Sequence, residues 1–342
     1  MKMYRIDPIQ AAAFRDLLGE ARRIVTVSHT HPDGDAVGSS LGFAETLRRA
    51  GKEVVTVFPD PTPATLDFML SGETRSNCLI HSENPAQTEA VLSRCDLLVC
   101  LDFPTLSRTE SLAGPLAALN VRKVLIDHHP GPDAGAFDLC FSDTELSSAS
   151  ELTFWVLTAL GAEIPLSAAT ALMTGMTTDT NNFSNSTRPS TFEMASRLLA
   201  LGVDRDAILD AINRQYEERR LRAMARLLEK MVITPKGAAY MILDAATRDA
   251  FGLEDGETEG FVNLPLSIAR VRMSLFLKET DGHFRVSVRS KPGCSANRCA
   301  MRHFHGGGHE LAAGGKLYFP QDIPTPADAA AYLEKVTDEE ID

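Results

Sequence analysis

Short apolar runs alternate with amphipathic stretches in the first half of the chain. The apolar runs are Ile24–Val27, Val54–Phe58, Leu97–Leu101 and Val124–Ile126. Unbroken runs of this length are typical of strands that are buried on both faces of a parallel sheet. After the first run, Leu41, Ala44 and Leu47 recur at helical spacing, which predicts a helix over Ser39–Ala50 that ends at Gly51. Repeated strand–helix–strand units predict an α/β fold with a doubly wound, mainly parallel N-terminal sheet.

The second half begins with a long helical pattern from about residue 191 to residue 231, where Pro235 and Gly237 follow its end. Strand-like runs then come at Ala239–Leu243, Ser274–Leu277 and Phe284–Val288, and a short helix is expected near the C-terminus. We therefore predict three parts: a catalytic domain over residues 1–190, a helical connector over 191–231, and a smaller C-terminal α/β domain over 232–342 that binds substrate.

Composition narrows the class of protein. The chain has 342 residues, of which 44% are hydrophobic and 23% charged, an ordinary balance for two globular domains. Its net charge of −12 repels long nucleic acid, so any polyanion must be held at a local site or by metal. We expect no binding to long duplex nucleic acid.

The six cysteines form no CxxC pair and no zinc-finger register, which favours reduced thiols over a disulfide framework. The N-terminal residues carry charges where a signal peptide needs an apolar run, and no stretch approaches the length of a membrane span. These observations predict a cytoplasmic protein that does not contact membranes.

Acidic and histidine side chains cluster where predicted strands end. They are His29, His31, Asp33 and Asp35 after the first run, Asp102 after the third, Asp127, His128 and His129 after the fourth, and Asp179 after the apolar stretch Ala168–Met173. In open α/β sheets, ligands bind in the crevice outside the carboxyl ends of the strands. Four segments are therefore expected to bring these side chains to one crevice.

Two or more imidazoles among several carboxylates form a mixed nitrogen and oxygen donor set. Such a set suits Mn²⁺, Fe²⁺, Co²⁺ or Zn²⁺ better than Mg²⁺ or Ca²⁺. We expect Pro32 and Gly34 to hold Asp33 and Asp35 in an extended loop that points them to different ions. Taken singly, an Asp after a strand is more often a helix N-cap, and an Asp-Gly pair is as often a plain turn. The joint placement favours a two-metal site.

The second domain carries a basic stretch. Between His283 and His309 there are five arginine and lysine residues and no acid. The stretch ends in Gly306-Gly307-Gly308-His309, and a glycine run lets backbone N–H groups approach an anion. A flexible hinge beside a solvated basic face is the alternative interpretation.

Together these motifs resemble the DHH phosphoesterases. Asp127-His128-His129 and the segment His29-x-x-Pro-Asp-Gly-Asp35 are similar to motifs of that family, as are Asp102 with Arg108 and Gly175-x-x-x-Asp179. The run from Gly306 to Gly314 resembles the C-terminal domain of the RecJ-like branch. The likeness is greatest to the NrnA-type group, whose members are bifunctional oligoribonucleases and pAp phosphatases.

The resemblance implies a role for each matching residue. His29, Asp33 and Asp102 would hold one divalent ion, and Asp35, Asp102, His128 and Asp179 the other, most plausibly Mn²⁺. Asp127, His129 and Arg108 would act in catalysis beside the metals. The substrate-binding residues would be Arg289, Ser290, Gly307, Gly308 and His309, across a cleft. His31 stands where many relatives have Asn, and it stays unassigned.

The expected activity is hydrolysis of very short oligoribonucleotides to mononucleotides and dephosphorylation of pAp. The alternatives are hydrolysis of signalling dinucleotides (pApA, pGpG or cyclic forms), hydrolysis of pyrophosphate or polyphosphate, and a nucleotide sensor without catalysis. The glycine run disfavours the pyrophosphatase branch, and the filled ligand positions disfavour the sensor. A homodimer is also compatible with the sequence.

Overall fold

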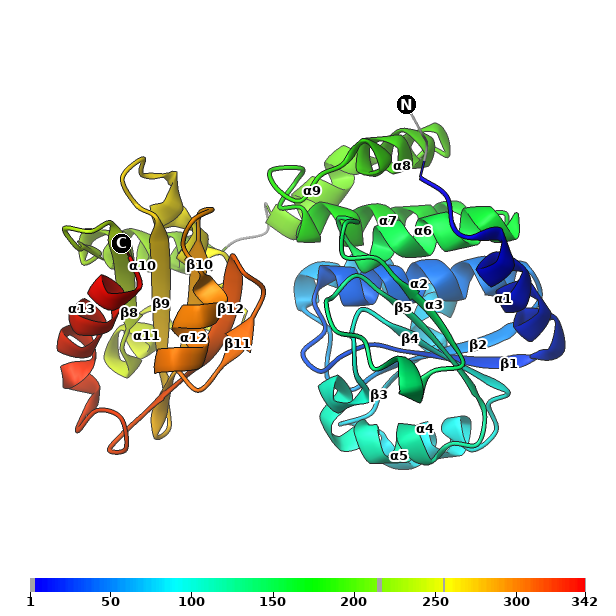
Figure 1. Cartoon of the computed structure of the whole chain (residues 1–342), viewed down its shortest axis with the longest axis horizontal. Helices are drawn as coiled ribbons and strands as arrows, with labels where there is room; N and C mark the ends of the chain where they lie inside the picture. Colours follow the sequence, from blue (N-terminus) through cyan, green and yellow to red (C-terminus); the bar gives the residue numbers. More distant parts are fainter. Residues whose placement is uncertain (1–3, 214–216, 255, 342) are drawn as a thin grey trace. The chain divides into compact units, whose positions relative to one another are not determined.

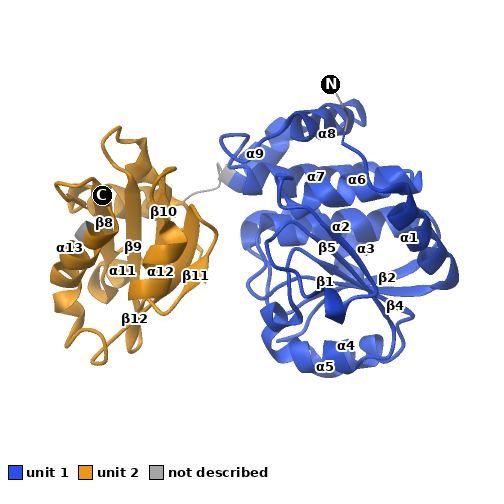
Figure 2. Ribbon diagram, in the orientation of Figure 1, with its two compact units in different colours: residues 1–215 blue, residues 216–342 orange. Residues whose placement is uncertain are grey.

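The computed structural model describes residues 4–213, 217–254 and 256–341. The chain forms two compact units, residues 1–215 and 216–342 (Figure 2). In the described residues, no helix is long and apolar enough to cross a membrane. The structure has all six cysteines as free thiols.

Unit 1 is built on a six-stranded parallel sheet with the order β3-β2-β1-β4-β5-β6. Its strands are β1 (Arg23–Val27), β2 (Glu53–Phe58), β3 (Cys78–Ile80), β4 (Leu97–Leu101), β5 (Arg122–Asp127) and β6 (Leu139–Ser142). β1 pairs in parallel with both β2 and β4, so the strand order reverses between β1 and β4. This is the doubly wound arrangement that the apolar runs predict, and its crevice lies at that switch point.

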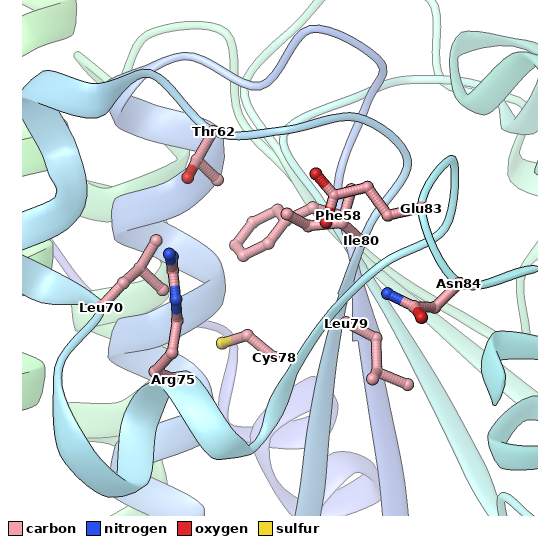
Figure 3. A pocket seen from close by; sticks show the side chains of 9 residues that line it. All are labelled: Phe58, Thr62, Leu70, Arg75, Cys78, Leu79, Ile80, Glu83 and Asn84. Atoms are coloured by element: carbon pink, nitrogen blue, oxygen red, sulfur yellow. The ribbon is translucent and has the colours of Figure 1, made fainter.

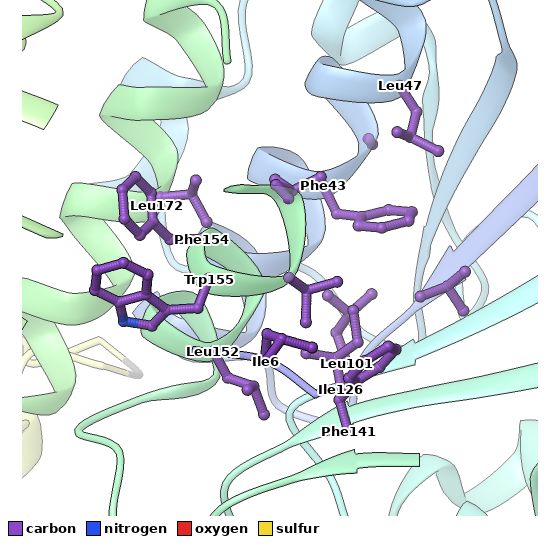
Figure 4. Packing of buried hydrophobic residues seen from close by; sticks show 14 of the residues in the cluster. Ile6, Phe43, Leu47, Leu101, Ile126, Phe141, Leu152, Phe154, Trp155 and Leu172 are labelled. Carbon is purple, nitrogen blue, oxygen red and sulfur yellow. The ribbon is translucent and has the colours of Figure 1, made fainter. Parts of the chain in front are cut away.

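Helices cover both faces of this sheet (Figure 1). On one face lie α1 (Pro8–Glu20), α2 (Gly34–Arg49), α6 (Ala149–Leu160) and α7 (Leu166–Asp179). They bury the largest apolar cluster, which includes Phe43, Trp155 and Leu172 together with Leu101 and Ile126 of the sheet (Figure 4). The other face packs against α4 (Pro85–Leu92) and α5 (Ala113–Ala118) through a second cluster.

Two expectations about local structure were wrong. The helix predicted over Ser39–Ala50 begins five residues earlier, at Gly34, because the carboxylate of Asp33 caps it by accepting from the N–H groups of Asp35 and Ala36. Asp33 and Asp35 therefore lie at a helix start and not in an extended loop. The stretch Ala168–Met173 belongs to α7, so Asp179 ends a helix and does not follow a strand.

A stripe of glycines lets α2 approach α7 closely. Gly34, Gly38 and Gly42 recur every four residues along one side of α2. A Cβ on Gly38 would lie 2.5 Å from the carbonyl oxygen of Ala171 and 2.8 Å from the backbone of Gly175. Because backbone atoms cannot move aside cheaply, Gly38 leaves no room for a side chain. The close packing brings Asp35 near Asp179.

Gly38→Ala is therefore expected to lower the free energy of unfolding by about 1–3 kcal/mol, the usual cost of overpacking a core. The matched control is Gly19→Ala in α1, where nothing lies within 4 Å of the added Cβ. In that control, the higher helix propensity of alanine should raise the free energy of unfolding by up to about 1 kcal/mol. Urea unfolding midpoints measure both effects, and equal gains for the two variants would contradict the close packing.

The predicted connector over 191–231 is not a separate part of the described structure, and its residues 214–216 lie outside the described ranges. Its first two helices, α8 (Pro189–Ala200) and α9 (Arg205–Asn213), belong to unit 1, where Met194 and Leu198 join the main core. Its last helix, α10 (Glu218–Glu229), belongs to unit 2 and packs Leu227 there. Each amphipathic helix buries its apolar face in the nearer core.

Unit 2 contains a mixed sheet with the order β11-β12-β10-β9-β8-β7. Its strands are β7 (Val232–Ile233), β8 (Ala238–Leu243), β9 (Met273–Thr280), β10 (His283–Ser290), β11 (Gly307–Gly308) and β12 (Ala312–Tyr318). Its helices are α10, α11 (Ala245–Phe251), α12 (Ala296–His303) and α13 (Ala329–Glu340), with a 3-10 turn η4 (Phe261–Ser267). The three predicted strand-like runs and the C-terminal helix are confirmed.

Candidate metal centre

The acid and histidine cluster lies at the carboxyl ends of β1, β4 and β5. His29 follows β1, Asp102 follows β4, and Asp127 ends β5 with His128 and His129 directly after it. Asp35 comes from the first turn of α2 and Asp179 from the last turn of α7. The topology thus brings these side chains to the switch point of the sheet, as the crevice argument predicts.

Their donor atoms form three overlapping groups, in each of which the atoms lie within 4.8 Å of one another. The groups are His29, Asp33 and Asp102; Asp35, His128 and Asp179; and Asp102, His128 and His129. His128 Nε2 is 3.6 Å from Asp102 Oδ1 and 3.6 Å from Asp179 Oδ2. Asp33 and Asp35 fall in different groups, and Asp102 and His128 each belong to two.

Asp102 is the most constrained member of the cluster. Its side chain is 3% exposed, and its Oδ1 has no hydrogen-bond partner in the described structure. Its φ of 66° is unusual for a residue other than glycine, a kind of strain that collects at functional sites. Burial, followed by the nearby charges of Asp35 and Asp33, raises the pKa of Asp102 well above its ordinary value.

The pKa values of Asp35 and Asp179 are also raised by their surroundings. Burial raises the pKa of Asp35, although its two oxygens accept from the N–H groups of Ala149 (2.6 Å) and Ser150 (2.8 Å) at the start of α6. Burial and then the charges of Asp35 and Asp33 raise the pKa of Asp179 well above its ordinary value. Carboxylates crowded in this way need a cation to stay ionised, so the residues present fit divalent metal ions.

Hydrogen bonds set the tautomers of two histidines. His29 Nδ1 lies 2.7 Å from the carbonyl oxygen of Thr30, which can only accept, so Nδ1 carries the proton and Nε2 is left for the cluster. His129 Nδ1 lies 2.8 Å from Asp127 Oδ1 but 3.7 Å from Asp102 Oδ1. His129 Nδ1 therefore donates to the buried Asp127, which makes His129 a poorer ligand than His128.

Arg108 and His31 border the cluster. The backbone carbonyl of Arg108 accepts from the N–H and the hydroxyl of Thr30, which ties the exposed Arg108 to the loop of His29. The side chain of His31 is 76% exposed, and its Nδ1 lies 3.6 Å from Asp60 Oδ2. No sequence motif indicated the Asp60 partner, which follows β2.

Five substrate-binding residues were expected in unit 2, and the structure separates their roles. The guanidinium of Arg289 donates to the carbonyl oxygens of Val288 and Ala313, and no acid pairs with it in the described residues. Burial lowers the pKa of Arg289. The hydroxyl of Ser290 is already used, because it donates to the carbonyl oxygen of Cys294 at 2.8 Å.

The glycine run forms a hairpin, β11 to β12, and not an open anion cradle. The N–H groups of this run are used within the protein. Gly306 N–H donates to the carbonyl oxygen of Ala300, and Gly308 N–H donates to Asn297 Oδ1. His309 N–H donates to the carbonyl oxygen of Ala312. A Cβ on Gly308 would lie 2.7 Å from Ala313 Cα. Close packing explains this glycine, and Gly307 lies beside it in β11 while the exposed His309 begins the turn.

The basic stretch of unit 2 is less basic than its sequence indicates. Arg298 and Arg302 of α12 both pair with Glu340 of α13, at 2.8 and 3.1 Å, and His303 joins them. Burial would raise the pKa of Glu340, but these three hydrogen bonds hold it below the ordinary value. Two of the five cations therefore serve helix packing.

A separate pocket of about 200 Å³ lies beside β2 and β3 (Figure 3). Its walls combine apolar side chains such as Phe58, Leu70 and Ile80 with Arg75 and Glu83. None of its nine lining residues belongs to the acid and histidine cluster. The pocket therefore adds no donor to the candidate metal centre.

Comparison with known proteins identifies the family. The N-terminal domain of the DHH family matches residues 23–176, and the DHHA1 domain matches residues 237–334. The chain is 31% identical over 314 residues to a probable bifunctional oligoribonuclease and PAP phosphatase NrnA of Streptococcus mutans, covering 90% of this chain and 94% of the relative.

Two solved structures show the same fold. An exopolyphosphatase-related protein from Bacteroides fragilis is 33% identical with a TM-score of 0.92, covering 98% of this chain and 97% of that one. RecJ from Thermus thermophilus in complex with Mn²⁺ has a TM-score of 0.58 at 16% identity, covering 97% of this chain and 54% of that one. The two domain matches, and the similarity to the Streptococcus mutans relative over most of both chains, agree with the motifs. The chain belongs to the DHH family of phosphoesterases.

Proposed function

We propose that this protein degrades very short oligoribonucleotides to mononucleotides and also removes a phosphate from pAp. The observation that carries the proposal is the set of overlapping donor groups that share Asp102 and His128 at the switch point of the sheet. The Streptococcus mutans relative, named for both activities, supports it because the similarity extends through both units.

Two divalent ions fit the donor groups. One would be held by His29, Asp33 and Asp102. The other would be held by Asp35, His128 and Asp179, together with Asp102, whose Oδ1 lies 3.6 Å from His128 Nε2. The mixed imidazole and carboxylate set favours Mn²⁺ among the common divalent ions. When bound, such ions polarise a phosphoryl oxygen and supply a nucleophilic water at neutral pH.

The chain's own residues hold and orient these groups. The Thr30 carbonyl fixes His29 with Nε2 facing Asp102 Oδ2 at 3.6 Å. Asp127 accepts from His129 Nδ1 and so orients the imidazole, and a proton on Nε2 would let His129 donate to an oxygen of the scissile phosphate. The exposed guanidinium of Arg108 would reach the same phosphate from the loop next to Thr30.

Unit 2 would bind the rest of the substrate. Arg289 supplies the clearest anion site, because a half-buried guanidinium without an acidic partner is best satisfied by a phosphate. Gly307, Gly308 and His309 would present the β11 hairpin beside it. Ser290 would support the strand beside Arg289, since its hydroxyl donates to the carbonyl oxygen of Cys294 and its N–H to that of Leu311.

A side-by-side hydrolysis assay with Mn²⁺ tests this proposal. The substrates are an RNA dinucleotide, a 24-nucleotide RNA, pAp, a cyclic dinucleotide and pyrophosphate, and EDTA replaces Mn²⁺ in the control. We expect fast loss of the dinucleotide and pAp, with slow attack on the 24-nucleotide RNA and no turnover in EDTA.

The alternatives give distinct outcomes in the same assay. Activity confined to pyrophosphate would overturn the proposal, as would faster hydrolysis of the cyclic dinucleotide than of the linear one. Binding of Mn²⁺ without turnover of any substrate would instead favour a nucleotide sensor.

A further inference from the structure

In the described part of unit 2, one face of β10 and β12 carries mainly polar side chains, although η4 lies close to β10. Side chains alternate across a sheet, and Phe284, Val286 and Val288 point into the core with Ala313 and Leu317. The residues between them lie on the opposite face: Arg285, Ser287 and Arg289 of β10, and Ala312, Gly314, Lys316 and Tyr318 of β12. All seven are half-buried or exposed, whereas on that face Phe276 of β9 is buried against Phe261 of η4.

A row of three cations crosses this face. Arg285 of β10 lies directly opposite Lys278 of β9 on one side and Lys316 of β12 on the other. Like charges in direct cross-strand register repel one another and destabilise a sheet. Arg285 and Lys316 are exposed, and in the described ranges no acid forms an ion pair with either, in contrast to Arg298 and Arg302. In a chain of net charge −12, the exposed pair Arg285 and Lys316 offers a local site that suits a polyanion.

The cross-strand pairs on either side of Arg285 and Lys316 extend this surface along the strands. On one side of the cations, Ser287 faces Gly314, and these two small residues lie between the Arg285 and Arg289 positions. On the other side, His283 faces Tyr318, and the ring of Tyr318 lies 5.5 Å from the rings of both His283 and His305. Tyr318 belongs to none of the apolar core clusters. It is therefore an aromatic ring at the end of a cationic surface.

Cations that follow a backbone, with aromatic rings on which bases stack, are the usual elements of a surface that binds single-stranded nucleic acid. From Arg289 to His283 is six residues, or about 20 Å at the rise of a strand, which exceeds the length of one nucleotide. The cations suit phosphates and the small residues between them leave room for a sugar–phosphate chain.

We propose that this face binds nucleotides of a single-stranded RNA beyond the one that reaches Arg289. Arg285 and Lys316 bind a backbone phosphate, and Tyr318 stacks on a base. The inference rests on the proposed function, since it assigns a binding surface to the further nucleotides of RNAs of about three to five nucleotides, an estimate from the length of the surface.

The test compares a five-nucleotide RNA with pAp as substrates of the full-length protein. In the Arg285→Ala/Lys316→Ala double variant, the ratio of KM for the RNA to KM for pAp should rise about tenfold, because charge-assisted contacts to phosphate are lost only from the longer substrate. Tyr318→Ala should raise the same ratio about fivefold or more, while Tyr318→Phe keeps the stacking ring and should leave it unchanged.

A binding measurement separates this surface from the metal centre. Fluorescence anisotropy of the labelled five-nucleotide RNA in EDTA reports affinity without turnover. The slope of log K against log salt should become shallower by about 0.7 for each phosphate contact removed from a single strand. Lys316→Ala and Lys335→Ala form a matched pair, since Lys335 is an exposed lysine of α13 away from this face, and Lys335→Ala should keep the wild-type slope.

Each outcome assigns a failure to one proposal. If the wild-type protein hydrolyses dinucleotides and pAp but the double variant keeps the wild-type KM ratio and salt slope, the RNA surface is wrong and the proposed function stands. If the wild-type protein hydrolyses neither substrate, the proposed function fails, and the anisotropy measurement still tests the surface. Equal losses in Lys316→Ala and Lys335→Ala would also overturn it, because they indicate only general charge attraction.

Discussion

Replacing Asp102 with asparagine is expected to abolish turnover and, at the same time, to raise the stability of the metal-free protein. Asp102 belongs to two donor groups, so its loss should disturb both of the proposed ions. Ions that stabilise the transition state by several kcal/mol would make this a loss of at least about 10³-fold in kcat. Asparagine suits the positive φ of this position, so the backbone is preserved.

The gain in stability has an electrostatic origin. Asp102 Oδ1 is buried without a hydrogen-bond partner among four other carboxylates, and the removal of this charge should stabilise the metal-free fold by about 1–3 kcal/mol. Because folding raises the pKa of Asp102, the carboxylate destabilises the fold above the unfolded pKa. The difference between variant and wild type should therefore be present at pH 7 and shrink as the pH falls toward 4.

The other end of the same strand supplies a matched control. Asp96, directly before β4, accepts hydrogen bonds from the side chain and the N–H of Arg23, which lower its pKa to about 2. Here the sign is opposite, because the ionised group stabilises the fold at pH 7 and that stability is lost as the pH falls through 2. Asp96→Asn should cost less than about 1 kcal/mol, since the pair is in contact with water, and should leave turnover unchanged.

Thermal unfolding in EDTA and with Mn²⁺, together with kcat for pAp, measures these effects. Wild type should melt higher with Mn²⁺ by linkage, and Asp102→Asn should lose most of that shift. An Asp102→Asn variant that melts lower than wild type in EDTA would contradict the charge repulsion. One that retains full kcat would remove Asp102 from the metal centre.

Sequence reasoning located most of the cluster because parallel strands place their carboxyl ends at one edge of a sheet. His29, Asp102 and His128 each follow an apolar run that forms a strand of the parallel sheet. Their place at its carboxyl edge can therefore be predicted without knowing the order of the strands. The same reasoning misassigned the segment before Asp179. Short runs of small apolar residues such as Ala168–Met173 do not distinguish a buried helix from a strand by periodicity.

Other features depend on contacts that the local sequence does not specify. The pairing of Arg298 with Glu340 joins residues that are 42 positions apart, so the stretch seemed more basic than it is. The glycine stripe on α2 is visible in the sequence at Gly34, Gly38 and Gly42, but its meaning requires knowing that α7 lies against it. The positive φ of Asp102 is likewise a property of the folded site.

Asp127 and His129 are expected to act as one catalytic unit. Asp127 is fully buried at the end of β5 and accepts from His129 Nδ1 at 2.8 Å, so it is a positioning residue that sets the tautomer and direction of the imidazole. Asp127→Asn keeps the shape of the side chain but loses the charge that holds the proton on Nδ1. We expect a drop of about 10–100-fold in kcat/KM for pAp, and a similar drop for His129→Ala.

The double variant Asp127→Asn/His129→Ala decides whether the two residues act together. When two residues act as a unit, the effects of replacing them do not add. The double variant should therefore be only slightly less active than the less active of the two single variants. Measured at saturating Mn²⁺, kcat/KM of the four proteins forms a double-mutant cycle. Losses that simply multiply would show that Asp127 acts independently of His129. Calorimetric titration with Mn²⁺ adds a second readout, because Asp127 belongs to none of the donor groups and Asp127→Asn should bind metal far better than Asp102→Asn.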